Sequence, residues 1–362
     1  MSLYRYVYAS VLWVLAMGIA NADTQGFRPF LKTEMFLYSE PVSLDSIRNN
    51  WQGRYWQGGQ KQMGTLRAEA GVRNGRWSIA GLYREDYYLD FSSDTADLYY
   101  GVENDLLIKR SDPYLLSLDA YRFRGVGLSA TKQFTFNPRL NGSLGVSVFK
   151  ASNLLEGRLT GQAQSTSEDE YSFQIQVDNQ YAEDPLFERT IDQAPSGIGV
   201  ALDASLAWQA TPKLQLSLKA HDIAGLIRWE GVPYTSAQAN SNNVIVDGEG
   251  FTKVNPILSG TESEKSHFTQ SLKPTAEATM QYALGQSAYL AEAKVKYFEG
   301  LTLFGVGLHK RNHVADWGIR YWPTSATVEG LVTHRRFGLS LGIDDIDLKE
   351  VRTAWLSLSY SH

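Results

Sequence analysis

Apolar and polar residues alternate along most of this chain. Leu66, Ala68, Ala70 and Val72 occupy every second position of residues 65–73, with charged or small residues between them. Successive side chains of an extended strand point to opposite faces, so the four apolar residues share one face. The pattern predicts a β-strand with one apolar and one polar side.

A hairpin turn follows this segment directly. Asn74-Gly75 is the strongest two-residue turn signal, and the alternation resumes at Trp77. We expect Val72 to pair with Trp77, which places the apolar faces of both strands on the same side of the sheet.

The alternation continues to the C-terminus and predicts an all-β protein. Strands are expected at 31–39, 64–73, 76–89, 95–103, 113–136 (one strand or two), 140–151, 154–164, 170–180, 196–209, 213–229, 271–283, 287–298, 301–311, 314–322, 326–334, 336–343 and 352–361. Some of these segments are expected to merge or to lie outside the main sheet.

The first residues have the three parts of a secretory signal peptide. Residues 1–22 contain one cation, Arg5, then an apolar run, and end in Ala20-Asn21-Ala22. We expect cleavage before Asp23, with an N-terminal membrane anchor as the alternative. The expected organisation is a signal peptide at 1–22, an N-terminal extension, first strand or plug at 23–59, and a barrel at 60–362.

Export and alternation together favour an antiparallel transmembrane β-barrel over a soluble sandwich. Strands of about ten residues recur along the chain, as expected for spans whose apolar face meets lipid and whose polar face lines the lumen. We predict about 14 strands, within a range of 12 to 16, because bacterial barrels have even strand numbers. Aromatic residues at strand ends are the expected membrane girdles: Trp77, Tyr83, Phe134, Phe136, Trp208, Tyr289, Tyr297 and Tyr360.

Composition narrows the function classes. The chain has no cysteine, which excludes disulfide scaffolds, metal-thiolate proteins and thiol enzymes. Its formal charge of -5 gives no electrostatic reason to expect a nucleic-acid partner. The mean hydropathy of -0.28 averages two opposite faces and does not exclude a barrel.

Charged residues on the polar faces are the candidate lumen lining. A mixed set of this kind either braces a narrow barrel through ion pairs or lines an aqueous pore. The candidates are Arg67, Glu69, Arg73, Asp203, Lys213, Lys219, Glu277, Glu292, Lys294 and Lys296.

Loop lengths predict the orientation of the barrel, because periplasmic turns are short and outer loops are long. Short connections are expected at Asn74-Gly75, Asn137-Pro138, Thr211-Pro212, Gly285-Gln286 and Pro323-Thr324. Long polar connections are expected at 180–195 and 230–267.

Several motifs resemble catalytic or metal-binding sites, but their position in the chain favours an ordinary role within β-strands. Gly338-Leu339-Ser340-Leu341-Gly342 matches a nucleophile elbow, which requires a strand-to-helix turn, and here it lies inside a strand. His221-Asp222 are neighbours that face opposite sides of a strand. His309, His313 and His334 lack the spacing of a metal site.

The Gly-x-Gly pairs and the acidic segments are also interpreted as structural features and not as ligand sites. The Gly-x-Gly pairs at 125–127, 197–199 and 305–307 lie in strands, where lumen-facing glycine makes room for crowded neighbours. The acidic segments 167–170 and 344–345 are expected to be solvated loop charges rather than calcium sites. No catalytic residue, cofactor or metal is predicted.

Residues 197–230 resemble a hairpin of a broad group of outer-membrane barrels. They combine alternating Gly197-Ile198-Gly199, a Thr211-Pro212-Lys213-Leu214 turn and a strand that runs from Asp222-Ile223 to Trp229. The group includes long-chain fatty-acid transporter-like and conjugal-transfer barrel proteins, and the resemblance implies a barrel that carries hydrophobic substrates. The C-terminal alternation from Trp355 to Tyr360 also resembles the strand that barrel-assembly machinery reads.

The functional hypothesis is an outer-membrane, porin-like channel or transporter for a small polar or amphipathic solute. The alternative is a non-conducting structural or assembly component of a secretion, pilus or conjugation system, and a lipid-modifying barrel enzyme using His221 or Ser340 comes third. Expected partners are outer-membrane lipid and lipopolysaccharide, the barrel-assembly machinery and periplasmic proteins, but no nucleic acid.

Overall fold

The computed structural model describes residues 26–106, 110, 112–165, 171–184, 190–241, 244–246, 252–254, 257–285 and 288–362. The predicted signal peptide and its cleavage site lie outside the described residues, as do the acidic segment 167–170 and Gln286.

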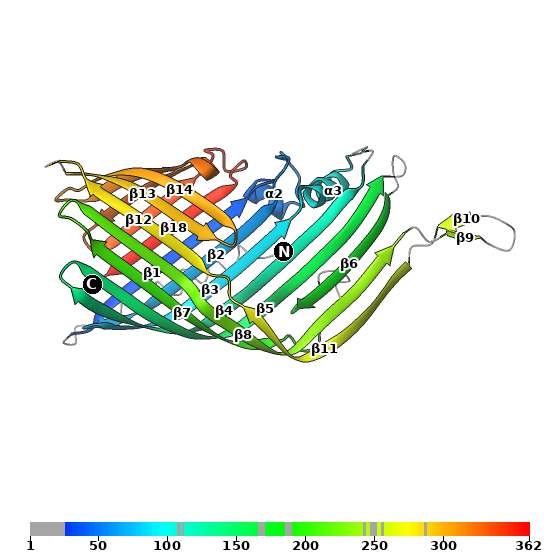
Figure 1. Ribbon diagram of the computed structural model, residues 1–362, viewed down its shortest axis with the longest axis horizontal. Coiled ribbons are helices and arrows are strands. Elements are labelled where there is room, and N and C mark those ends of the chain that lie inside the picture. Colours follow the sequence, from blue (N-terminus) through cyan, green and yellow to red (C-terminus); the bar gives the residue numbers. More distant parts are fainter. Residues whose placement is uncertain are drawn as a thin grey trace.

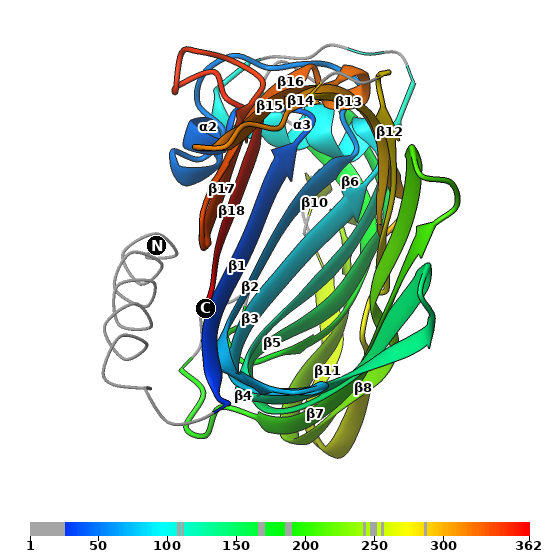
Figure 2. The ribbon, with the colours of Figure 1, turned by 90° about the vertical axis from the view of Figure 1, so that its left-hand side faces the viewer.

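Fourteen antiparallel strands close into a barrel, which confirms the predicted fold class and strand number. Figure 2 shows β18, β1 and β2 side by side where the first and last strands close the wall. In order around the wall the strands are β1 (Arg28–Ser39), β2 (Lys61–Asn74), β3 (Trp77–Phe91), β4 (Tyr114–Asn137), β5 (Leu140–Ser165), β7 (Ser196–Gln209), β8 (Leu214–Asn240), β12 (Thr275–Ala283), β13 (Tyr289–Phe298), β14 (Leu301–Lys310), β15 (Asp316–Trp322), β16 (Thr327–His334), β17 (Phe337–Ile343) and β18 (Thr353–Ser361).

The barrel wall therefore begins well before residue 60. Of residues 23–59, Arg28–Ser39 form β1, which pairs with β18 on one side and β2 on the other. The rest of the described segment is the connection to β2 and contains the short helix α2 (Leu44–Arg48). Ser43 caps α2, since its side chain accepts a hydrogen bond from the Ser46 backbone N–H.

Two additional strands extend the wall at one end. β6 (Tyr171–Tyr181) pairs with β5 and β8, and β11 (Ile257–Ser271) pairs with the opposite edge of β8. A two-stranded sheet, β9 (Val244–Val246) with β10 (Thr252–Val254), lies beyond them (Figure 1). Much of 230–267, predicted as a long connection, is thus the continuation of β8 and the start of β11, because this polar stretch pairs with itself above the apolar belt.

The predicted strand at 95–103 is wrong, because these residues lie in helix α3 (Ser93–Glu103). The Ser92 side chain accepts a hydrogen bond from the Thr95 backbone N–H, and Asp94 stands in the first helical turn. These are helix-start signals that outweigh a short alternation. α3 packs with the β1–β2 connection in a small apolar cluster that contains Val42 and Trp51.

The other helical segment is the single 3-10 turn η1 (Pro323–Ser325) between β15 and β16. No helix in the described part of the chain is both long and apolar enough to cross a membrane.

The two ends of the barrel differ. The connections after β2, β4, β7, β12, β14 and β16 are short, and β1 begins and β18 finishes at this same end, which we call the turn end. The opposite loop end has α2, α3 and the extended strands (Figure 1). Of the predicted short connections, Pro323-Thr324 belongs to the loop end and the others to the turn end. Short turns are periplasmic in outer-membrane barrels, so we expect the loop end to face outward.

The first hairpin has a register two residues away from the predicted one. Asn74 pairs with Trp77 and Val72 with Ile79, so the turn consists of Gly75 and Arg76. Gly75 has a φ of 58°, a conformation that glycine adopts without strain. A shift by two keeps each side chain on its predicted face.

The alternation separates an apolar exterior from a mixed interior. Outward residues such as Ile79 and Leu128 are 57% and 64% exposed, whereas inward aromatic residues such as Trp229 and Trp322 are fully buried. A closed sheet with an apolar outer belt satisfies its backbone hydrogen bonds and presents hydrocarbon-compatible side chains to lipid.

Candidate functional site in the barrel interior

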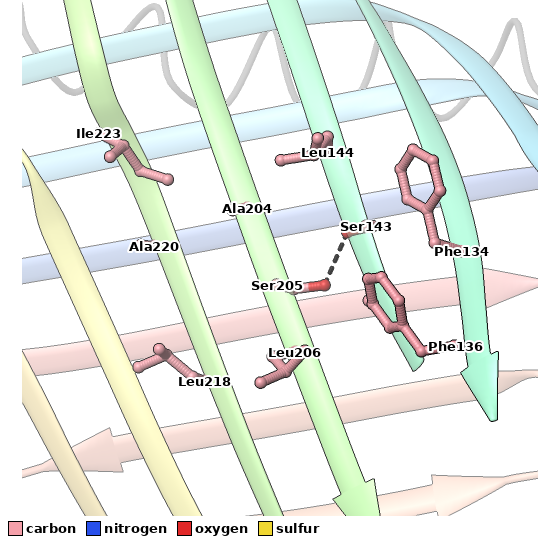
Figure 3. A pocket seen from close by; sticks show the side chains of 11 residues that line it. Phe134, Phe136, Ser143, Leu144, Ala204, Ser205, Leu206, Leu218, Ala220 and Ile223 are labelled. Atoms are coloured by element: carbon pink, nitrogen blue, oxygen red, sulfur yellow. Dashed lines mark hydrogen bonds between the residues drawn. The ribbon is translucent and has the colours of Figure 1, made fainter. Parts of the chain in front are cut away.

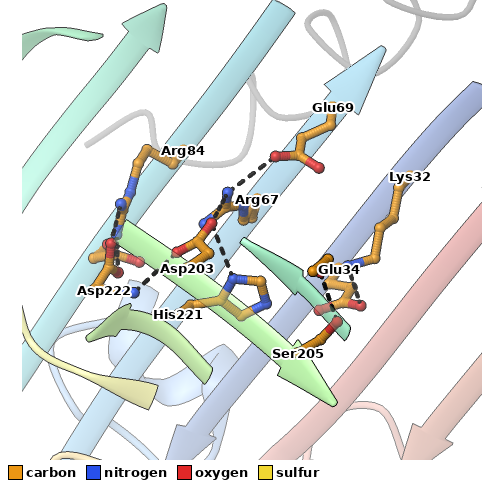
Figure 4. A network of polar contacts seen from close by, with 11 residues as sticks. Lys32, Glu34, Arg67, Glu69, Arg84, Asp203, Ser205, His221 and Asp222 are labelled. Carbon is orange, nitrogen blue, oxygen red and sulfur yellow. Dashed lines mark hydrogen bonds and ion pairs between the residues drawn. The ribbon is translucent and has the colours of Figure 1, made fainter. Parts of the chain in front are cut away.

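Charged side chains from opposite parts of the wall meet across the interior (Figure 4). Arg84 on β3 forms a two-point ion pair with Asp222 on β8, with nitrogen–oxygen distances of 2.8 and 2.7 Å. It also donates to Asp86 at 2.5 Å. β3 and β8 are separated around the wall by β4, β5 and β7, so the pair spans the interior. Both side chains are almost completely buried.

A second group adjoins this pair. Arg67 donates to Asp203 at 2.6 Å and to Glu69 at 2.9 Å, which again joins β2 to β7 across the interior. His221 Nδ1 lies 3.4 Å from the Asp203 carboxylate. The Asp222 backbone N–H donates to Asp203 at 3.0 Å, at a bulge in β8 where Asp222 has a φ of 55°. The bulge is the local feature that aims these groups at one another.

A third group lies among the shorter strands. Arg320 on β15 bonds to Glu292 on β13, at 2.7 Å from Nε, and to Glu329 on β16 at 2.5 Å. Glu277 pairs with Lys294 at 2.8 Å and Lys296 at 3.2 Å. Each arginine and lysine of these three groups therefore has an opposite charge beside it, as burial requires.

Aromatic rings form a layer at the loop end of the interior. We call Phe36, Phe298, Trp322 and Trp355 the aromatic layer. The ring centres of Phe36 and Trp355 are 4.1 Å apart, those of Phe36 and Phe298 4.7 Å, and those of Trp322 and Trp355 5.2 Å. Phe36 and Phe298 come from β1 and β13, which are far apart around the wall.

Cations lie against this layer. The Lys296 Nζ is 4.3 Å from the centre of the Trp355 ring, and the Arg320 guanidinium is 5.5 Å from that of Trp322. Trp322 Nε1 in turn donates to Glu329 at 2.9 Å. The layer thus combines stacked ring faces with charged groups on its inner side, an arrangement that favours cation–π contacts.

Glycine makes room for large inward side chains, as the Gly-x-Gly segments predict. A Cβ atom on Gly199 would lie 2.2 Å from the Phe149 ring, and one on Gly197 would lie 2.8 Å from the Trp229 ring. The same holds for Gly305 beneath Trp322, at 2.9 Å. These positions accept only a hydrogen because ring atoms from neighbouring strands lie within 3 Å of the place that a Cβ would occupy.

The predicted lumen residues occupy different parts of the barrel. Arg67, Glu69, Asp203, Glu277, Glu292, Lys294 and Lys296 belong to the interior ion-pair groups. Lys219 stands opposite Glu277 in the β8–β12 register. Arg73 is near the turn end, with its guanidinium 5.8 Å from the Phe30 ring centre. Lys213 is in the β7–β8 turn.

The predicted girdle residues face outward. Tyr83 lies in the middle of β3, and Tyr297 lies at the loop end of β13. Near the turn end are Trp77, Phe134, Phe136, Trp208, Tyr289 and Tyr360.

The structure does not bring the candidate catalytic residues together, and it places the candidate metal ligands in separate contacts. Ser340 lies within β17, on a strand that is not adjacent to β8 and His221. His309 Nε2 is 3.1 Å from Glu292, whereas His334 Nδ1 is 2.6 Å from the Val314 carbonyl oxygen.

Sequence reasoning missed Arg84 and Arg320, the two arginines with the most extensive interior contacts. The alternation contained the signal for Arg84, since it follows outward-facing Tyr83 and must face inward. Its partner Asp222 was not predictable, because the β8 bulge changes the local direction of the strand.

A groove of about 420 Å³ lies on the outer wall, across β4, β5, β7 and β8. Its walls include Phe136, Leu206, Leu218 and Ile223, each at least 41% exposed, and its floor contains Ala204 and Ala220 (Figure 3). The lining is apolar and lies within the outward belt, so the groove is part of the lipid-facing surface and not of the interior.

The closed wall, apolar belt and polar interior define an outer-membrane β-barrel. No protein-family model and no curated protein matches the chain. Solved structures with similarity include a deletion mutant of the TodX monoaromatic hydrocarbon channel, at 10% identity and a TM-score of 0.47 over 93% of this chain and 90% of that one. The Pseudomonas putida toluene transporter TodX gives 8% identity and 0.42, over 93% and 89%. A Pseudomonas aeruginosa FadL homologue gives 8% and 0.28, over 93% and 90%.

Proposed function

We propose that this barrel is a gated channel for small amphipathic solutes, with the aromatic layer as its gate. The observation that supports the proposal is the stacking of Phe36 on β1 against Phe298 on β13, which joins separate parts of the wall at the outer mouth, with Trp355 beside Phe36. A planar apolar group replaces a ring–ring contact at little cost, because its own faces make the same stacking contacts. The polar part of the solute then meets Lys296 and Arg320 on the inner side.

Flux through liposomes that contain the purified protein tests this function. We expect benzoate to enter faster than glucose, and Phe36→Ala/Trp355→Ala to increase both flux and planar-bilayer conductance. Trp208→Ala is the matched control, because it removes an outward aromatic ring and leaves the interior intact. The absence of flux and conductance in both wild type and the double variant would exclude a channel.

A second candidate is a non-conducting structural component of an envelope assembly. It is favoured by the buried Arg84–Asp222 and Arg67–Asp203 pairs, which tie opposite walls together. This candidate would be supported if Phe36→Ala/Trp355→Ala shows no conductance and the protein co-purifies with periplasmic proteins after crosslinking.

A further inference from the structure

Four basic residues stand on the outward face of the wall, where lipid contact is expected. Val126 and Leu128 of β4 face outward and are 59% and 64% exposed. Arg124 and Arg122 continue the same face of β4 toward the loop end, at spacings of two residues. The apolar belt on this strand therefore ends in two consecutive outward arginines.

The neighbouring strands continue this basic band. Lys150 on β5 pairs with Val126 on one side and Ile198 of β7 on the other, and Ile198 pairs with Arg228 of β8. Lys150 and Arg228 are exposed. We call Arg122, Arg124, Lys150 and Arg228 the basic band. Adjacent strands are about 4.8 Å apart, so the band spans only a few strand widths.

The two arginines share one carboxylate. Their Nη2 atoms are 3.6 and 3.4 Å from Glu85, to which Tyr83 also donates a hydrogen bond at 3.1 Å. The arginine side chains are 23% and 28% exposed, against 9% for Glu85. A guanidinium has five N–H donors, so one acid leaves several donors of this pair available to another acceptor, although the Nε of Arg124 is buried. Glu230 lies on the same face of β8 as Arg228, two residues further along the strand.

Charges on a lipid-facing wall are costly in the hydrocarbon and favourable at the headgroup level. The band lies at the loop end of the belt, which faces outward. The lipid of that leaflet is lipopolysaccharide, whose lipid A carries phosphate groups. We propose that the basic band binds the lipid A phosphates, with Arg122 and Arg124 as the principal contacts. Arginine suits this role because its planar fork binds phosphate through two parallel hydrogen bonds.

The same strand offers a matched control. Lys132 faces outward on β4 at the turn-end side of the belt, with its Nζ 5.0 Å from the Trp77 ring centre and 5.4 Å from that of Phe134. It has the same charge and faces the same side of the sheet, but it lies at the level of the inner leaflet. Lys132→Gln therefore removes an outward cation without touching the band.

Native mass spectrometry of the full barrel in detergent, titrated with bisphosphorylated or dephosphorylated lipid A, tests the proposal. We expect wild type and Lys132→Gln to prefer the bisphosphorylated lipid, and Arg122→Gln/Arg124→Gln to lose affinity for it by about tenfold or more. Arg122→Lys/Arg124→Lys keeps the charge and should retain part of the affinity.

Folding of each variant is checked by its heat-modifiable gel mobility. If the wild-type protein binds bisphosphorylated and dephosphorylated lipid A equally well, the proposal is wrong, whatever the variants show. Equal losses in the Lys132 and double-glutamine variants would also overturn it, because a general charge effect would then account for the binding.

Discussion

The Arg84 guanidinium and the Asp222 carboxylate face each other across the barrel interior with both nitrogen–oxygen pairs within 2.8 Å. Arg84 also lies 4.9 Å from the Phe123 ring centre and 5.3 Å from that of Phe149. A single side chain thus connects the long-strand side of the wall to the bulge in β8. Such cross-wall ion pairs lie beside a cluster of buried apolar side chains that includes Phe123, Phe149 and Trp229.

Removal of Arg84 should destabilise the barrel strongly. Arg84→Ala leaves Asp222 and Asp86 buried without their counter-charge, and such a loss costs about 3–5 kcal/mol. The free energy of unfolding in urea, measured with the barrel in lipid vesicles, reports the effect. Arg158→Ala breaks an exposed pair with Asp119 and should leave the unfolding midpoint unchanged. Similar unfolding midpoints for the two variants would show that the Arg84–Asp222 pair does not stabilise the barrel.

A methyl group at Gly199 should also destabilise the barrel. It would lie 2.2 Å from the Phe149 ring, and overpacking of this kind costs about 1–3 kcal/mol. Gly330→Ala is the matched control, because no atom lies within 4 Å of its added Cβ. Phe149→Leu in the Gly199→Ala background should restore part of the loss, and a strictly additive double-mutant cycle would argue against the contact.

Attachment of α3 should weaken in acid. Burial raises the pKa of Asp94, but the Arg110 guanidinium and the Leu115 backbone N–H donate to its carboxylate and hold the pKa below its usual value. A lowered folded pKa stabilises the folded state above the unfolded pKa of about 3.9, and this contribution is lost as the pH falls through the folded value.

Hydrogen exchange of α3, corrected for intrinsic rates, measures this loss. We expect lower protection at pH 2.5 than at pH 5, and Asp94→Asn should reduce protection at pH 5 and flatten the difference. Glu103→Gln, in the last turn of the same helix, serves as the control and should keep the pH dependence. An unchanged difference in Asp94→Asn would assign the effect to another group.

Glu277 should set the charge selectivity of the opened barrel. It neutralises Lys294 and Lys296, so Glu277→Gln leaves two cations near the mouth without their acid. This prediction rests on the proposed channel function. In the Trp355→Ala background, Glu277→Gln should raise the anion-to-cation permeability ratio. The reversal potential under a KCl gradient measures it, with Asp119→Asn as an exposed-loop-end control. No shift relative to that control would remove Glu277 from the ion path.

Alternation was sufficient to predict the wall but not the contacts that fill it. Strands such as 196–209 were correct because a period of two fixes which residues share a face. The helix at 93–103 was missed because Ala96, Leu98, Tyr100 and Val102 occupy every second position, and its capping residue, Ser92, stands before this run. Cross-wall partners such as Arg67 and Asp203 depend on the tilt of the strands and on the bulge at Asp222, neither of which a linear pattern encodes.

The pairing of β1 with β18 also determines when the molecule can be finished. Phe36 meets Trp355 at the seam, so the first strand of the wall must wait for the last of the fourteen. Until then, the facing edges of β1 and β18 are open and can pair with any other exposed strand. Closure brings together strands that are more than 300 residues apart in the chain, which places it among the slow steps of assembly. Protection of the open edges during this interval is therefore as much a requirement of this architecture as the stability of the completed wall.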